Sequence, residues 1–245
     1  MHVLTDAIVL GARGHGEHGA IVRAMTPADG MLAGYVRGGQ SRRLRPILVP
    51  GNIVRAEYRA RVDTQLPAMT AELVHSRAPL LSEPLPAAAI EWSTALAAAV
   101  LPEGQSDPAM FDALSGLLGA VEAAPSARGW AAALVRFELL LLTALGVGLD
   151  LTRCVVTERA DDLAFVSPKS ARAVSRSAAA GHEARLLPLP AFLLSGSAGT
   201  LDEAIGGLRL TRHFLDRELG EARRGAVLAA RDRLDDRLAR AAGVH

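Results

Sequence analysis

The chain has 245 residues, half of them hydrophobic and 22% charged, with a formal net charge of +1. This length suits two modest domains or one large one, and the composition is that of a globular rather than a disordered protein. The single cysteine, Cys154, excludes an intrachain disulfide and fits a reducing compartment. No basic-then-apolar signal pattern begins the chain, so we expect a cytoplasmic protein.

The first eighty residues predict five strands joined by turns that contain glycine or proline. The strand-like runs span 2–14, 19–26, 31–39, 52–62 and 67–78. Alternation in the fourth run places on one face Ile53, Arg55, Glu57, Arg59 and Arg61, and on the other Val54, Ala56, Tyr58, Ala60 and Val62. Five short strands with turn chemistry between them favour a small closed barrel.

A basic stretch, VRGGQSRRLRPIL at 36–48, connects the third and fourth strands of this predicted barrel. Residues 1–80 carry ten arginines and six acids, whereas residues 81–150 carry two arginines and eight acids. Guanidinium groups match phosphate bidentately, so this asymmetry points to contact with a polyanion. An arginine-rich surface loop without function would have the same composition. The residues predicted to contact a nucleic acid or other polyanion are Arg37, Arg42, Arg43, Arg45, Arg55, Arg59 and Arg61.

After Pro84 the spacing of apolar residues becomes helical, with helices predicted over 87–101, 107–124 and 127–146. Asp107 before Pro108 suits a helix N-cap, and Gly146 suits a helix end. Arg136 and Glu138 interrupt the most apolar run, which therefore predicts a buried helix and no membrane span.

Beyond residue 150 the pattern predicts a partly extended insert at 151–175, then helices around 189–196, 208–219 and 225–241. Alternating charge at 234–243 suggests a solvated terminal helix. The overall expectation is an α+β protein, with a small five-stranded barrel at 1–80 and a mainly helical domain at 81–245.

No motif of catalysis stands out. The HGEH sequence at 15–18 lacks the helix that would present two imidazoles on one face, and no GK[ST] follows the nearby glycines. The SGSAG sequence at 195–199 lacks the spacing of a nucleophile elbow. We therefore expect no enzyme, no metal and no cofactor. Only Tyr35 and Tyr58 could stack on bases in the barrel, so any contact with a nucleic acid should rest mainly on phosphates.

The order of the segments resembles the RecO family of bacterial DNA repair proteins. The segments that carry the resemblance are DAIVLGARGHGEHGAIVRAMTPADG at 6–30, YVRGGQSRRLRPILVPGNIV at 35–54, VRFELLLLTALGVGLDLTRC at 135–154, LAFVSPKSARAV at 163–174 and LRLTRHFLDREL at 208–219. The resemblance implies an OB-fold, a helical domain, and a recombination mediator that binds and anneals single- and double-stranded DNA. It also implies two partners, RecR and the C-terminal tail of single-strand-binding protein, and association with the nucleoid.

One departure from the family concerns zinc. Many members carry a four-cysteine module in the insert, whereas here Thr157 stands at the CxxC position after Cys154. A structural zinc needs about four ligands, so we expect a degenerate module at about 151–180 and no metal.

The partner tail is acidic and ends in an apolar residue with a free carboxylate. Its receptor needs an apolar pocket with a cation at the rim, and the residues predicted to form it are Arg136, Phe137 and Leu141. Phe137 and Leu141 share a helix face that could equally be core.

Two other classes of protein remain open at this stage. An RNA-binding OB-fold protein of translation or RNA metabolism would share the basic barrel but not the long helical domain. A hydrolase would need a site that none of these motifs provides.

Overall fold

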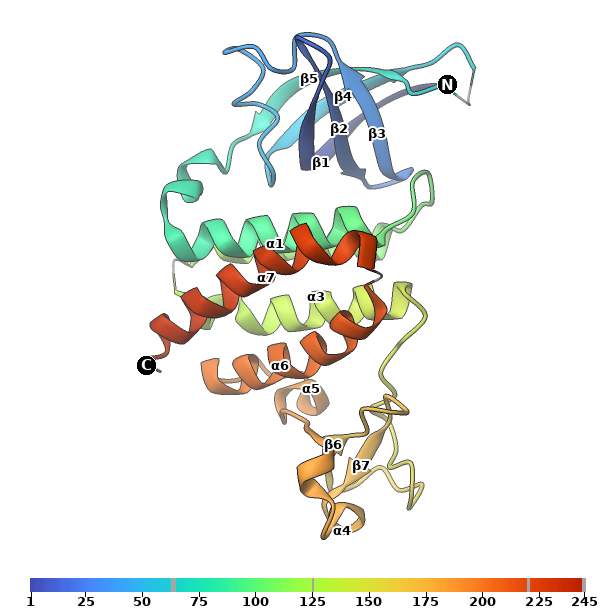
Figure 1. Ribbon diagram of the computed structural model, residues 1–245, viewed down its shortest axis with the longest axis vertical. Coiled ribbons are helices and arrows are strands. Elements are labelled where there is room, and N and C mark those ends of the chain that lie inside the picture. The colour runs from blue at the N-terminus through green and yellow to red at the C-terminus, as the bar shows by residue number, and fades with distance from the viewer. Residues whose placement is uncertain (63–64, 125, 220, 244–245) are drawn as a thin grey trace.

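The computed structural model describes residues 1–62, 65–124, 126–219 and 221–243. Its elements form three parts in a row: a barrel, a helical body and a small insert (Figure 1). The barrel strands are β1 (His2–His15), β2 (Gly19–Thr26), β3 (Gly30–Val36), β4 (Ile53–Arg59) and β5 (Ala68–His75). A short helix, η1 (Ala78–Ser82), leads from the barrel to the helical body.

The five strands close into a barrel in the order β1-β2-β3-β5-β4. Strand β1 pairs antiparallel with both β2 and β4, while β3 meets β5 in parallel where Tyr35 lies opposite Ala68. Alternate residues such as Val22, Val54 and Tyr58 fill the interior and are fully buried. The predicted α+β class with an N-terminal five-stranded OB-fold barrel is confirmed.

The outer surface of the barrel is not entirely solvated, because one side rests on the helical body. Ile8, Leu10, Met25 and Met31 point outward and belong to the hydrophobic core of the helices. Arg77 adds a buried polar contact, donating to the Gly51 carbonyl at 2.7 Å and to the Glu122 carboxylate at 3.1 Å. One outer face of the barrel therefore belongs to the core of the helices, which is separate from the core inside the barrel.

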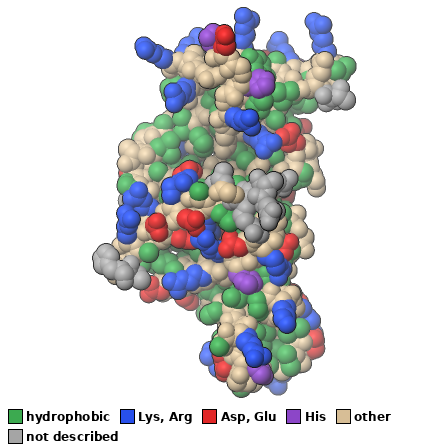
Figure 2. Space-filling view, in the orientation of Figure 1, with side chains coloured by type: hydrophobic (Ala, Val, Ile, Leu, Met, Phe, Trp, Pro, Cys, Tyr) green, Lys and Arg blue, Asp and Glu red, His purple; other side chains and the backbone are tan. Residues whose placement is uncertain are grey.

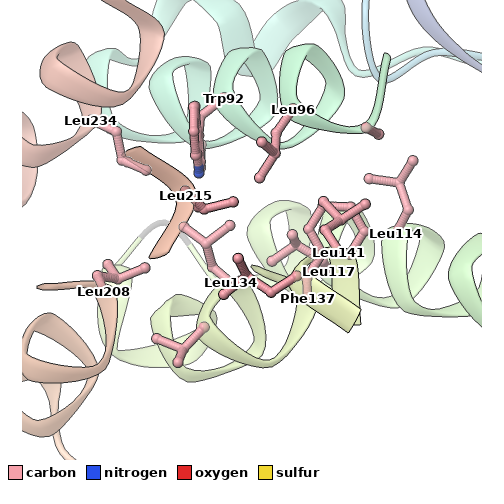
Figure 3. Close-up of a cluster of buried hydrophobic side chains, with 14 of the residues drawn as sticks. Trp92, Leu96, Leu114, Leu117, Leu134, Phe137, Leu141, Leu208, Leu215 and Leu234 are labelled. Atoms are coloured by element: carbon pink, nitrogen blue, oxygen red, sulfur yellow. The ribbon is translucent and has the colours of Figure 1, made fainter. Parts of the chain in front are cut away.

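The helical body contains α1 (Pro84–Val100), α2 (Pro108–Ala123), η2 (Ala127–Gly129), α3 (Ala131–Ala144), α5 (Phe192–Ser195), α6 (Leu201–Glu218) and α7 (Glu221–Ala241). As predicted, Asp107 caps α2, accepting a hydrogen bond from the Met110 amide at 3.0 Å. Figure 3 shows Trp92 and Leu96 of α1 facing Leu134 and Phe137 of α3 across the core. None of the helices in the described residues combines the length and the apolar character needed to span a membrane.

Two of the helix predictions were wrong. Helix α6 begins seven residues before the predicted start at 208, because Thr200 and Glu203 form a capping box. Helix α7 is not merely a solvated end: it packs along α1 and buries Ala230, Leu234 and Leu238. Four-residue spacing puts these three side chains on one face, which the charges between them obscure in the sequence.

The insert forms a small sheet of its own at the far end of the molecule (Figure 1). Its elements are β6 (Leu163–Val166), β7 (Ala173–Ser175), α4 (Arg176–Ala179), η3 (Glu183–Arg185) and β8 (Leu187–Pro188), with the strands in the order β7-β6-β8. Cys154, Val174 and Ala179 form its buried centre.

Candidate nucleic-acid interface

Residues 37–52, which we call the arginine loop, connect β3 to β4 on the barrel. The predicted third strand ran to residue 39, but β3 ends at Val36 because Gly38 adopts a left-handed conformation with φ of 69°. At Gly39 a Cβ atom would lie 2.6 Å from the Cβ of Ala20. Each glycine of the Gly38–Gly39 pair is therefore required, one for its dihedral angles and one for its close packing.

Hydrogen bonds and apolar contacts anchor the arginine loop at both ends. The Gln40 side chain donates to the carbonyls of Gly16 and Gly19 at 3.1 and 2.9 Å, in the β1–β2 turn. The buried Asn52 side chain donates to the carbonyls of Pro46 and Ile47 at 3.0 and 3.1 Å. Apolar side chains between these anchors pack against the barrel core, namely Leu44, Ile47 and Leu48.

The anchored backbone presents four exposed guanidinium groups, which we call the loop arginines: Arg37, Arg42, Arg43 and Arg45. None of them forms an ion pair or a side-chain hydrogen bond with any residue that the structure describes. Figure 2 shows basic side chains projecting from the barrel end of the molecule. Four uncompensated positive charges on one short, ordered segment create a local field that attracts polyanions.

The arginines on β4 are placed differently. Arg55 forms an ion pair with Asp6 on the neighbouring strand β1, which raises the pKa of Arg55. Arg59 donates to the Glu57 carboxylate at 2.9 Å through Nε. Hydrogen bonds from His2 and Arg59 lower the pKa of Glu57. Acids on the same face therefore neutralise both β4 arginines.

The placement of Arg61 on the β4 face was wrong. Strand β4 ends at Arg59, which pairs with His2 at the end of the β1–β4 ladder. Arg61 therefore lies beyond the sheet in an exposed bend. Of the two barrel tyrosines, Tyr58 is fully buried and cannot stack on a base. Tyr35 is partly exposed and lies edge-on to His15, with ring centroids 6.0 Å apart.

Sequence reasoning missed two further arginines, Arg13 and Arg23, on the outer face of β1 and β2. Strand pairing places Arg13 opposite Ile21, and Ile21 opposite Tyr35, in one row across three strands. Arg23 lies two residues further along β2 and is exposed. Alternation of buried and exposed residues in GAIVRAMT could have indicated Arg23, because Val22 and Ala24 on either side are buried.

The three residues predicted to bind the partner tail do not lie together on the surface. Phe137 and Leu141 are buried in the core, 2% and 0% exposed, and only Arg136 is exposed. The Arg136 guanidinium lies over the Phe192 ring, 5.2 Å from its centroid, and donates to the Ser197 carbonyl. The exposed apolar residue of this helix face is Leu140, one turn after Arg136 and 38% exposed.

Cys154 is fully buried, as predicted. Its sulfur accepts hydrogen bonds from the backbone amides of Ser175, Val156 and Thr157 at 3.2, 3.4 and 3.5 Å. Burial opposes ionisation, but the donors at Ser175 and Thr157 prevail and lower the pKa of the thiol to about 6. Within the described residues, no three side chains of His, Cys, Asp and Glu lie close enough to share a metal ion.

A basic OB-type barrel whose outer face packs into the core of a helical body is the class of protein that these features define. The family descriptions "Recombination protein O N terminal" and "Recombination protein O C terminal" match residues 1–77 and 85–226. The DNA repair protein RecO of Rhodospirillum centenum is 46% identical over 239 residues, covering 96% of this chain and 94% of that protein. RecO of Phenylobacterium zucineum is 47% identical over 213 residues, 86% of each chain.

RecO of Caulobacter vibrioides is 42% identical over 238 residues, covering 96% of this chain and 97% of that protein. The chain therefore belongs to the recombination protein O family, RecO, whose members are DNA repair proteins.

Proposed function

We propose that this chain is a non-enzymatic recombination mediator that binds and anneals DNA through the arginine loop. The observation that carries the proposal is the combination of a rigidly anchored loop with four exposed arginines that lack carboxylate partners among the described residues. Phosphate is the ligand that such a forked, permanently charged donor set fits. We further propose that it acts in the cytoplasm at the nucleoid.

Binding through the loop should be nearly independent of base sequence. Phosphate contacts fix position and register but carry no sequence information, which base-edge and stacking contacts supply. Of the barrel aromatics, Tyr35 is partly exposed and Tyr58 is buried. A mediator that must act on any broken strand needs this kind of sequence tolerance.

The test is the triple substitution Arg42→Ala, Arg43→Ala, Arg45→Ala. DNA affinity should fall alike for all sequences, and the log–log salt slope should fall by about 0.7 per lost phosphate contact on single strands or about 0.9 on duplex. Because the three side chains are exposed, the urea unfolding midpoint should stay unchanged. An unaltered slope and affinity would show that the loop does not bind DNA.

The alternative of an RNA-binding OB-fold protein uses the same loop chemistry and differs in the preferred nucleic acid. Competition between single-stranded DNA, duplex DNA and RNA of one sequence distinguishes the two proposals. A mediator of DNA recombination should bind single-stranded DNA at least as tightly as RNA. The names of the relatives, all DNA repair proteins, favour the DNA proposal.

We also propose that the helical body receives the acidic tail of single-strand-binding protein at Arg136, with RecR as a second partner. Arg136 is exposed, with an aromatic ring beneath it and Leu140 one turn away. Because Phe137 and Leu141 lie in the core, Leu140 replaces them as the apolar contact of this proposal. A cation beside an exposed apolar side chain matches a peptide that ends in an apolar residue and a carboxylate.

For this site the change is Arg136→Ala, measured by calorimetric titration with the isolated tail peptide. Affinity should fall by about 1.5–3 kcal/mol, the scale of a hydrogen bond to a charged group. Binding of naked DNA should be unaffected, whereas Arg43→Ala should weaken DNA binding and leave the peptide unaffected. Normal peptide binding by a folded Arg136→Ala protein would place the tail elsewhere.

A further inference from the structure

We propose that the β1–β2 hairpin separates two strand-binding surfaces, so that one protein can hold two DNA strands during annealing. This inference rests on the proposed function, since the first surface is the arginine loop. The second surface is the outer face of the hairpin where it meets α1, with Arg13 and Arg23 as its cations. Its ligand is the phosphodiester backbone of a second single strand.

Two hollows lie on opposite sides of the same segment of β1. The first, of about 470 Å³, is lined by Ala12 and Gly14 together with Arg45 and Pro50 of the arginine loop. The second, of about 660 Å³, is lined by Arg13 and lies between the barrel and α1. Successive side chains of a strand point to opposite faces, so Arg13 lies on the other side from Ala12 and Gly14.

The second hollow has the chemistry of a strand-binding groove. Small side chains of α1, namely Ala95, Ala98 and Ala99, line it on one side, and Val227 of α7 lines it on another. Arg13 at its rim is exposed and has no ion-pair partner among the described residues. Arg23 at the same rim contacts Glu103 at 3.3 Å and the Ala98 carbonyl at 3.3 Å.

Tyr35 makes a nucleic acid a better occupant than an acidic peptide. It lies in the row that runs from Arg13 through Ile21 across the same outer face. Its ring is partly exposed, and one stacked base adds about 1–3 kcal/mol to single-strand binding in such sites. Cations that contact phosphate beside a ring that stacks on bases are the usual combination for single-stranded DNA.

Two surfaces on either side of one hairpin would solve the electrostatic problem of annealing. Two bare strands repel each other, and each is attracted only where cations neutralise its phosphates. The loop arginines would hold one backbone and Arg13 the other, joined by Arg23 where a phosphate displaces Glu103, and the bases that do not stack on Tyr35 would be free to pair. A protein with one surface would bind a strand but would gain less in bringing two together.

The experiment loads the full-length protein with one donor-labelled poly-dT strand and titrates a second, acceptor-labelled poly-dT strand, so that energy transfer reports two strands on one protein. Annealing of complementary oligonucleotides is followed in parallel. Arg13→Ala should leave the first binding step unchanged, weaken the second about three- to tenfold, and slow annealing by a similar factor. Arg128→Ala, which removes an exposed arginine of the helical body, is the matched control.

A second variant is expected to strengthen binding of the second strand, an effect that misfolding could not produce. Glu103→Gln removes the carboxylate that neutralises Arg23, so the second strand should bind about threefold more tightly, the scale of one surface ion pair. If Arg13→Ala and Glu103→Gln both leave the second step and annealing unchanged, the two-surface proposal is wrong. The proposed function still stands in that case, provided that the triple loop variant loses first-strand binding.

Two other outcomes would also overturn the inference. If Arg13→Ala weakens binding of an acidic peptide but not of the second strand, the hollow is a protein-docking site. If two-strand complexes form only from two copies of the protein and do not depend on Arg13, annealing proceeds between molecules. Normal first-strand binding by the triple loop variant would instead contradict the proposed function itself.

Discussion

The arginine loop and the α6–α7 pair contain similar densities of arginine, yet the two regions place the charge in different surroundings. In the loop, the four arginines are exposed and lack partners among the described residues. In the helices, Arg212 alone contacts Asp232 and Asp235 at 2.7 Å each and Asp216 at 3.5 Å. Figure 2 accordingly shows acidic and basic side chains interleaved over the helical body. Charge that remains available to a ligand is therefore not proportional to the number of arginines.

The most buried charge in the helices is the pair formed by Glu138 and Arg231, 0% and 1% exposed. Glu138 also accepts hydrogen bonds from Trp92 Nε1, at 2.7 Å, and from the hydroxyl of Thr211. Arg231 further donates to Asp235 and lies over the Trp92 ring, 5.2 Å from its centroid. This cluster joins α1, α3, α6 and α7, so its arginine has a structural role.

The largest effect is expected from Arg231→Met, which leaves Glu138 buried without its cation. Breaking a buried pair on one side typically costs about 3–5 kcal/mol, to be measured as the urea unfolding free energy. Arg233→Met is the matched control on the same helix, because its pair with Glu91 is half exposed and contributes about 0–1 kcal/mol. Equal costs for the two variants would show that burial does not distinguish these pairs.

The loss of unfolding free energy in Arg231→Met, which we call the deficit, should depend on pH. Burial raises the pKa of Glu138, and Arg231 is the main influence that opposes it. Without Arg231 the folded-state pKa rises further above the unfolded value, so the folded state resists ionisation as the pH increases. The deficit should therefore be small below the unfolded pKa of about 4.3 and grow toward neutral pH. A deficit of the same size at pH 4 and pH 7 would contradict this account.

Much of the barrel could be predicted from the sequence because its signals are local. Alternating burial and turn glycines each depend on a few consecutive residues, as does the Asp107–Pro108 cap of α2 in the helical body. Pairing of charges is not local: Arg55 lies 49 residues from Asp6, and Arg231 lies 93 residues from Glu138. A basic face and a neutralised face consequently look alike in the sequence.

The same limit explains the errors in the helical body. The periodicity that makes Phe137 and Leu141 share a face is the same for a core face and for a pocket. In α7, charged residues stand between Ala230 and Leu234, and the packing of this helix on α1 appears only in three dimensions. Whether Phe137 and Leu141, or the apolar side of α7, are buried depends on which distant helix packs against them.

A smaller effect on DNA binding is expected from the β4 arginines. Arg55→Ala with Arg59→Ala should change the affinity for single-stranded DNA less than about threefold, because Asp6 and Glu57 already neutralise these charges. The measurement is a fluorescence anisotropy titration beside the triple loop variant, which should lose far more. A comparable loss in the two variants would mean that paired arginines exchange their carboxylates for phosphate, and that the comparison between loop and strand does not hold.

No effect is expected when chelator is added, because we predict that the insert holds no zinc. A structural zinc would need about four ligands, and here Cys154 offers one thiolate while Thr157 occupies the next position of the motif. The centre of the insert is apolar instead: Val174 and Ala179 are buried beside Cys154, and Leu163, Phe165 and Leu186 pack around them. Such a core can fix the small sheet without metal.

The measurement is elemental analysis of the purified protein, combined with thermal unfolding in the presence and absence of chelator. Zinc should be substoichiometric and the melting temperature unchanged, since removal of a structural zinc would remove folding free energy. Cys154→Ala provides the contrast: it deletes the buried sulfur that accepts three backbone amides, so it should lower the melting temperature although chelator does not. One zinc per chain, or a melting temperature that falls with chelator, would mean that ligands other than a cysteine set stabilise the insert.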